Sequence, residues 1–291
     1  MITLPDRRTI DPCGLVPLST LQKFGRVTEG QSVNGLLACD VSITMADHGE
    51  AALTIRLDEP RVTQSDMTMH DLVTESESLG LSVVHPRYEN TRDSQACIHQ
   101  LNFADRSAIG VDAFAPSNLA TDDFCLIGKA ALAAVVSAVR RGHLKHRTFP
   151  ANTLAARPDI CGMVTPDIRG LVPSLRSATL DESPGGVRCV WKNGEFSLMW
   201  SIYATPRAGM SYEPRPYLDR AQIAGRETVL TRLIPGRCDA TTSGHALGVT
   251  DVEGNADWEV AALTIFGPTD PDSLCVIGRN VAAMLWPTLP K

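Results

Sequence analysis

Two histidines in this sequence have the spacing of a shared metal site. His143 and His146 lie three residues apart, and neutral imidazole is a common zinc ligand. Arg141 and Arg147 flank the pair, and no carboxylate is adjacent. Positive neighbours oppose a bound cation, so we interpret this stretch as a solvated linker and expect no metal ion.

The sequence gives equally little support for catalysis by a serine nucleophile or by carboxylates. Ser243 stands two residues from His245, but a nucleophile and base need a geometry that spacing does not supply. A group of four carboxylates suits acid/base chemistry, yet a charged helix face is the simpler interpretation: Asp66, Asp71, Glu75 and Glu77. The chain has no His-Glu-x-x-His, no Gly-x-Ser-x-Gly and no phosphate-binding glycine loop. We assign no catalytic residue and expect no cofactor.

The eight cysteines are the strongest chemical signal. Metal ligation favours close pairs such as C-x-x-C, whereas the shortest gap here is the 26 residues from Cys13 to Cys39. An even number and wide spacing favour disulfides, and therefore an oxidising compartment. Eight buried, reduced thiols in a cytosolic protein are the alternative.

The cysteines also show that the chain is doubled. Residues 122–129 read Asp-Asp-Phe-Cys-Leu-Ile-Gly-Lys, and residues 272–279 read Asp-Ser-Leu-Cys-Val-Ile-Gly-Arg, with Cys275 standing 150 positions after Cys125. The other cysteines recur at similar offsets. We predict two four-cysteine domains, 1–145 and 155–291, joined by a linker within 142–157. A chain of 291 residues suits two such domains.

Each copy has the same predicted series of elements. A helix is followed by a hairpin, an irregular segment with one strand, a second hairpin and a final helix. In the irregular segments we predict short helices over 67–77 and 216–224. The predicted fold class is α+β: a tandem repeat of a two-layer domain, with a mostly antiparallel five-stranded sheet and both helices on one face.

Several residues are expected to define the helices. Thr165 is a predicted N-cap followed by Pro166, and Asp122 or Asp123 is predicted to cap the last helix of the first copy. Gly128 and its counterpart Gly278 interrupt helix propensity at the same place, which predicts a close approach of helix to sheet.

Four cysteines per copy allow three pairings. We favour the pairings that tie each terminal helix to a strand: Cys13 with Cys39, Cys97 with Cys125, Cys161 with Cys189, and Cys238 with Cys275. Each closed loop then contributes about 3 to 4 kcal/mol through chain entropy.

Composition excludes several classes of protein. The chain is 43% hydrophobic and 21% charged, which is typical of a globular protein and not of a disordered one. The net charge of −6 disfavours a nucleic-acid surface. The longest apolar run, 130–139, is too short to span a bilayer.

Aromatic residues of the second copy are a candidate ligand or partner surface. Three lie on one predicted hairpin and two on a Pro/Tyr-rich loop: Trp191, Trp200, Tyr203, Tyr212 and Tyr217. Packing in the core is the alternative for the tryptophans, and a plain surface connection is the alternative for the loop.

The opening motif Asp11-Pro12-Cys13-Gly14-Leu15, with a cysteine in the next strand and two around the last hairpin, resembles a known family. It is similar to a domain of actinobacterial cell-envelope lipoproteins with a D-P-C motif, and to the extracellular sensor domain of mycobacterial Ser/Thr kinases. The second copy has Asp-Ile-Cys-Gly instead. The resemblance implies two disulfides per domain, an α+β sheet fold and an envelope location, and it supplies no catalytic residue.

The leading hypothesis is a non-catalytic, secreted or envelope-anchored protein that binds an envelope protein or an apolar small molecule. Residues 1–6 lack a charged start and an apolar core, so we expect a signal segment, and with it any membrane attachment, to have been removed. The alternative is an envelope hydrolase or transferase with a site in one copy only. The sequence defines no oligomeric state.

Overall fold

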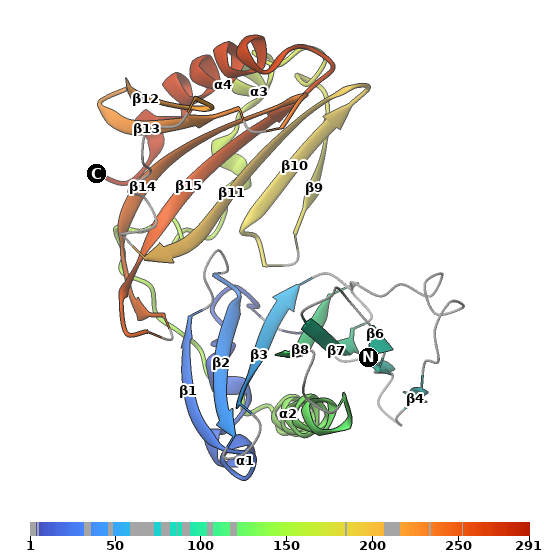
Figure 1. The fold of residues 1–291 in the computed structure, drawn as a ribbon. Coiled ribbons are helices and arrows are strands. Elements are labelled where there is room, and N and C mark those ends of the chain that lie inside the picture. The colour runs from blue at the N-terminus through green and yellow to red at the C-terminus, as the bar shows by residue number, and fades with distance from the viewer. Residues whose placement is uncertain are drawn as a thin grey trace. The chain divides into compact units, whose positions relative to one another are not determined.

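The structure, a computed structural model, describes residues 4, 6–31, 36–45, 49–58, 73–76, 82–85, 87–88, 94–103, 107–116, 121–183, 185–206, 216–232, 234–251 and 253–291. The chain divides into two compact units (Figure 1). Unit 1 comprises Met1–Thr148 with Thr250–Asn255, and unit 2 comprises Phe149–Val249 with Ala256–Lys291. Each unit is described by itself.

Unit 1 combines an antiparallel sheet with helices at the two ends of its sequence. It begins with η1 (Cys13–Leu15) and α1 (Leu18–Gln22) and closes with α2 (Thr121–Arg141). Its strands are β1 (Arg26–Gln31), β2 (Ala38–Met45), β3 (Gly49–Asp58), β4 (Val73–Ser76), β5 (Ser82–His85), β6 (Arg87–Tyr88), β7 (Ser94–Asn102) and β8 (Ala108–Pro116).

Unit 2 has the same plan. It begins with η3 (Cys161–Met163) and α3 (Pro166–Arg169) and closes with α4 (Pro271–Leu285) and η5 (Trp286–Thr288). Its strands are β9 (Thr179–Glu182), β10 (Arg188–Asn193), β11 (Phe196–Pro206), β12 (Leu218–Ile223), β13 (Arg226–Thr231), β14 (Arg237–Thr250) and β15 (Ala256–Phe266).

The two sheets have the same strand order. The first runs β1-β2-β3-β8-β7-β5-β4, with β6 pairing on β7, and the second runs β9-β10-β11-β15-β14-β13-β12. Apart from β6, each strand of unit 1 has a counterpart at the same place in unit 2. The α+β class and the antiparallel pairing agree with the prediction, but five strands per sheet was wrong: the described residues form sheets of eight and seven strands.

Edge strands explain the difference in strand number. β9 is exposed along its whole length, and β12 is mostly half-buried or exposed, so neither shows the alternation that identifies a strand in sequence. The helix predicted over 216–224 is wrong, because β12 lies there and pairs with β13. The helix predicted over 67–77 is contradicted at β4, and residues 67–72 and 77 lie outside the described residues.

Both terminal helices of unit 1 lie on one face of its sheet. A disulfide joins Cys97 of β7 to Cys125 of α2, and another joins Cys13 of η1 to Cys39 of β2. Strand alternation puts Cys39, Ile55 and Val111 in one row on that face. The disulfides Cys161–Cys189 and Cys238–Cys275 place η3 and α4 on one face of the second sheet in the same way. These are the four favoured pairs.

The helix termini follow capping rules in unit 2. The Thr165 hydroxyl accepts the Ile168 N–H with Pro166 at the first helical position, as predicted. Asp270 caps α4 by accepting the Ser273 N–H at 2.9 Å. In unit 1, α2 begins at Thr121, so Asp122 and Asp123 lie inside the helix and the predicted cap is wrong.

The recurrent helix glycine has a different environment in each unit. A Cβ added at Gly128 would lie 2.5 Å from Cδ2 of His99, so α2 approaches the sheet too closely there for any side chain. A Cβ at Gly278 would lie 3.8 Å from the Cys238 sulfur, which is ordinary contact. The predicted close approach is therefore confirmed at Gly128 only. Among the described residues, no helix has the length and apolar character needed to cross a bilayer.

Candidate functional site

The face of each sheet opposite its helices, here called the far face, differs between the two units. Strand register makes the comparison possible. Cys39 pairs with Ile55 in unit 1, and Cys189 pairs with Trp200 in unit 2. The next far-face residue along the second strand is Arg56 in unit 1 and corresponds to Ser201 in unit 2.

The same comparison extends to the following strand. Ile55 pairs with Val111, and Trp200 pairs with Leu263. The residues after these are therefore equivalent, so Asp112 of β8 corresponds to Thr264 of β15.

In unit 1 the far face carries a buried ion pair. Nη2 of Arg56 lies 2.6 Å from Oδ2 of Asp112, and the aspartate side chain is 1% exposed. Gly110 pairs with Arg56 in register, and a Cβ there would lie 3.0 Å from Nη2. The glycine therefore makes room for the guanidinium. Beside this pair, Thr54 donates to Oδ1 of Asp40 at 2.7 Å.

In unit 2 the far face is more apolar. Four apolar side chains are half-buried on this face of β10, β11 and β15: Val190, Met199, Tyr203 and Phe266. Each follows or precedes a residue that points toward the helices. The methionine takes the place that corresponds to Thr54. Aromatic and thioether side chains that keep partial exposure are typical of ligand-contacting surfaces.

A polar cluster borders this apolar surface. Asp239 accepts hydrogen bonds from Nε of Arg237 at 2.9 Å and from the Thr264 hydroxyl at 2.6 Å. The Arg237 guanidinium lies 5.5 Å from the centroid of the Phe266 ring, which is within cation–π range. Asp239 therefore holds the Arg237 charge over the Phe266 ring.

Of the five aromatic residues predicted to form a ligand surface, the two tryptophans lie in the core. Trp200 is 0% exposed and Trp191 is 2% exposed. The indole N–H of Trp200 donates to the Ile160 carbonyl at 3.0 Å, and its ring lies 6.0 Å from that of Trp286. The core packing that the sequence left open describes both, since they point toward the helices.

The tyrosines are distributed differently. Tyr203 is half-buried on the far face of β11, one residue from Ile202, which points toward the helices. Tyr217 is half-buried just before β12. Tyr212 lies outside the described residues. Within the predicted set, the structure places Tyr203 alone beside the other apolar far-face residues.

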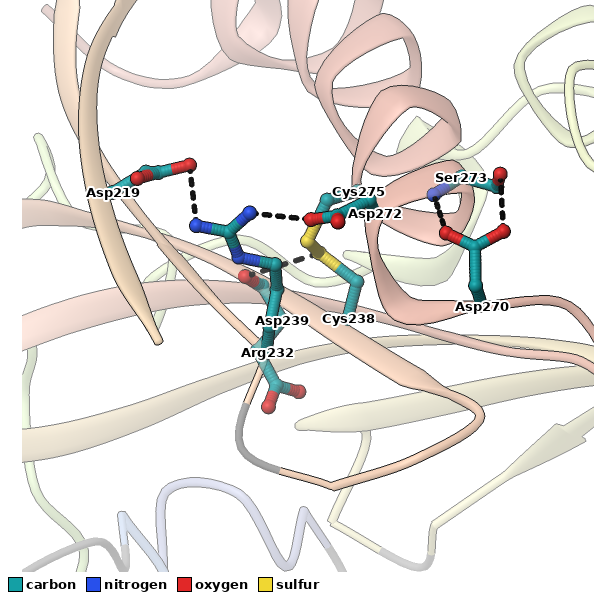
Figure 2. A network of polar contacts seen from close by, with 8 residues as sticks. All are labelled: Asp219, Arg232, Cys238, Asp239, Asp270, Asp272, Ser273 and Cys275. Carbon is teal, nitrogen blue, oxygen red and sulfur yellow. Dashed lines mark hydrogen bonds and ion pairs between the residues drawn. A yellow bond between two sulfur atoms is a disulfide. The ribbon is translucent and has the colours of Figure 1, made fainter. Parts of the chain in front are cut away.

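Figure 2 shows a second polar network, at the start of α4. Arg232 follows β13 and bridges Asp219 of β12, at 2.9 Å, and Asp272 of α4. The Cys238–Cys275 disulfide lies beside it. Hydrogen bonds from Ser273 hold the pKa of Asp270 below its ordinary value. Both the ion pairs and the disulfide fasten the helix to strands, so we assign this network a structural role.

The structure does not bring together the residues that the sequence analysis considered for metal binding or acid/base catalysis, and some of them lie outside the described residues. Nδ1 of His146 is 2.8 Å from the Thr9 hydroxyl, while His143 is exposed. Among the described residues, one group has metal-ligand proximity, Cys13, Cys39 and Glu29, and both of its sulfurs are in a disulfide. Asp66, Asp71 and Glu77 are outside the described residues, and Glu75 belongs to β4.

Glu259 of β15 is a buried carboxylate that the sequence did not single out. Its two oxygens accept the backbone N–H groups of Leu154 and Ala155, at 2.9 and 2.7 Å. Burial raises its pKa, against the opposing effect of these bonds and of the charges of His245 and Arg157. The residue fastens the segment that opens unit 2. Ser243 is exposed and His245 half-buried on the neighbouring strand β14.

Comparison with known proteins adds little. No protein-family model and no curated protein matches the chain. The di-domain ARO/CYC BexL from the BE-7585A biosynthetic pathway aligns over 89% of this chain and 85% of its own, with 11% identity and a TM-score of 0.18. DynU16 from the dynemicin biosynthetic locus aligns over 92% and 87%, with 10% identity and a TM-score of 0.17. The tesB protein of Mycobacterium avium subs paratuberculosis aligns over 75% and 93%, with 8% identity and a TM-score of 0.14. Scores this low carry no argument about fold or activity.

Proposed function

We propose that this is a non-catalytic, extracytoplasmic binding protein made of one duplicated module, and that the far face of unit 2 binds an apolar ligand or an apolar segment of an envelope partner. Four disulfides are typical of proteins outside the cytoplasm. The envelope location follows the resemblance to lipoprotein and sensor domains.

One observation carries the proposal. In register, the helix-side rows Cys39-Ile55-Val111 of unit 1 and Cys189-Trp200-Leu263 of unit 2 are both apolar and buried. On the far face, Asp40 and Thr54 of unit 1 are replaced by half-buried Val190 and Met199 of unit 2, and the charged pair Arg56–Asp112 is replaced by uncharged Ser201 and Thr264. Duplicated scaffolds need the same core to fold, so the face that diverges is the one free to acquire a binding role. Met199 and Tyr203 supply the apolar contact surface: they lie four residues apart on the far face of β11, and Val190 pairs with Met199 in register.

The test uses a long-chain fatty acid that carries a fluorescent label. We expect saturable binding to the wild-type protein, and a loss of affinity of at least about tenfold in Met199→Asp, because a charged carboxylate replaces an apolar contact. Val276→Asp is the matched control, because it also replaces an apolar side chain by a carboxylate. Val276 is 61% exposed on α4, away from the far face. Equal losses in both variants, or no saturable binding by the wild-type protein, contradict the proposal.

The alternative, an envelope hydrolase or transferase, rests on a separate observation. The charge of His245 acts on Glu259, and Ser243 lies two residues from that histidine. Labelling of Ser243 by a fluorophosphonate probe, abolished in His245→Ala, would favour this activity over a binding role. Absence of labelling at Ser243 counts against it.

A further inference from the structure

A run of positive charge follows the last turn of α2. Residues 140–147 read Arg-Arg-Gly-His-Leu-Lys-His-Arg. Arg140 and Arg141 end the helix and are exposed, and Gly142, at φ +64°, turns the chain out of it. Lys145 is exposed as well. Arg147 is different: it is largely buried, donates to the Leu36 carbonyl, and burial lowers its pKa to about 10.

The N-terminal arm adds two more cations to the same place. The Asp11 N–H donates to the Lys145 carbonyl at 2.9 Å, and the Arg147 N–H donates to the Thr9 carbonyl at 2.6 Å. Ile10 and His146 form an antiparallel bridge between these bonds. Residues 9–11 of the arm therefore lie beside residues 145–147, and Arg7 and Arg8 directly precede this paired segment. We call residues 7–8 and 140–147 together the cationic strip.

Three carboxylates of the described residues lie near the strip. Asp6 accepts the Thr9 hydroxyl at 2.6 Å, and Asp11 and Glu29 are close enough to Lys145 or to each other to affect the Glu29 pKa. Within the part of the chain that the structure describes, Arg8, Arg141 and Lys145 form no ion pair.

The fold itself does not require this charge. Cations at a helix C-terminus stabilise the helix dipole, which is sufficient to explain one or two of them. However, α4 is the equivalent helix of unit 2, and its last turn has no basic residue.

We propose that the cationic strip docks unit 1 onto a phospholipid surface that carries negative charge, through the lipid phosphates. Arginine matches phosphate oxygens with paired N–H donors, and five of the six cations are arginines. A lipid surface presents many phosphates at once, so cations spread over two chain segments act together, whereas one free phosphate meets one or two of them.

The surface is built for adsorption without insertion. The large, exposed hydrophobic side chains of the described residues all lie elsewhere: Leu126, Leu171, Leu180, Ile234, Val276 and Met284. Binding that depends on exposed charge alone is reversible and weakens as salt screens it. This inference is independent of the apolar far face of unit 2.

Vesicle sedimentation tests the proposal with the full chain. Vesicles of phosphatidylcholine alone are compared with vesicles that also contain phosphatidylglycerol, at low and at high salt. The strip variant is Arg140→Gln, Arg141→Gln and Lys145→Gln. Its matched control is Arg26→Gln, Lys129→Gln and Arg279→Gln, which removes the same charge from three exposed positions elsewhere.

We expect the wild-type protein and the control to bind the vesicles that contain phosphatidylglycerol at low salt, and to be released at high salt. The strip variant should lose on the order of 100-fold in partition coefficient, because each of the three cations contributes about fivefold. Unchanged thermal unfolding of the variant shows that it is folded. Equal binding to neutral vesicles, or an equal loss in the control, overturns the proposal. Saturable binding of inorganic phosphate without vesicle binding also overturns it and points to a free anion.

Discussion

Arg56 and Asp112 form a buried ion pair in unit 1, while the equivalent residues of unit 2, Ser201 and Thr264, are uncharged. The same topology is therefore stable without this pair. Removing one partner strands a buried charge, so we expect Asp112→Ala to lower the free energy of unfolding by about 3 to 5 kcal/mol. Urea denaturation measures it.

The double variant Arg56→Met with Asp112→Leu removes both charges. It therefore separates the cost of leaving one buried charge unpaired from the cost of losing the ion pair. It should recover about 2 kcal/mol or more relative to Asp112→Ala, because well-packed apolar residues replace a buried pair at little cost. The exposed pair Arg220–Glu227 is the control, and Glu227→Gln should cost less than about 1 kcal/mol. A double variant no more stable than Asp112→Ala would show that the two charges are needed separately.

Gly128 and Gly278 are predicted to respond to alanine with opposite signs. In Gly128→Ala the new Cβ meets the buried His99 ring at 2.5 Å, so unit 1 loses stability, by about 1 to 3 kcal/mol. In Gly278→Ala the nearest atoms are 3.8 Å away, so helix propensity decides, and unit 2 gains up to about 1 kcal/mol. Calorimetry of the two single variants measures both shifts. A loss of stability in Gly278→Ala would mean that α4 lies closer to its sheet.

Glu259 predicts a pH dependence of known sign. Burial raises its pKa, so the folded protein binds the proton more tightly than the unfolded chain does. Its contribution to stability is then fully present below the unfolded pKa of 4.5 and is lost as the pH rises through the folded pKa. Glu259→Gln removes this titration. The difference in unfolding free energy, wild type minus variant, should therefore fall as the pH rises from below 4.5. Denaturation of both proteins at several pH values measures this difference.

A constant difference between wild type and Glu259→Gln across that range would show that the carboxyl titrates normally. Glu253→Gln is a suitable control, because Glu253 is an exposed carboxylate in the loop between β14 and β15. Its difference from wild type should be small and should not follow the same trend.

The disulfides of the two units should differ in their reactivity toward a thiol reductant. Exchange requires a thiolate to reach a sulfur atom. Cys13 and Cys125 of unit 1 are half-buried, whereas all four cysteines of unit 2 are buried. Under native conditions we expect Cys13, Cys39, Cys97 and Cys125 to be alkylated first, as mapped by mass spectrometry after brief reduction. Simultaneous alkylation of all eight would indicate global unfolding instead.

The sequence predicted the elements that have one face packed against a core. The strands around Cys39 and Cys189 and the long last helices show clear periodicity, because each has one face against a core. The edge strands β9 and β12 do not, since their pairing is set by a neighbouring strand and both of their faces are largely accessible. Tertiary context, not local propensity, decides such segments.

The binding surface could be predicted less well than the fold. Trp191 and Trp200 were conspicuous by type, but which face of a strand carries a residue depends on register, and the register puts both toward the helices. Alternation does contain a usable signal: Arg56 stands between Ile55 and Leu57, so a charge on the other face of a buried strand was already visible. Its partner Asp112 lies 56 residues further along the chain, on β8, so the sequence did not reveal that these two residues pair.

The order of the sulfur bonds has a consequence for biogenesis. The eight cysteines pair consecutively, the first with the second and so on, over separations of 26, 28, 28 and 37 residues. When such a chain emerges from a translocation pore with its N-terminus first, each thiol meets its proper mate before a competitor arrives. An oxidase that joins thiols in order of appearance would therefore form the native links without an isomerase.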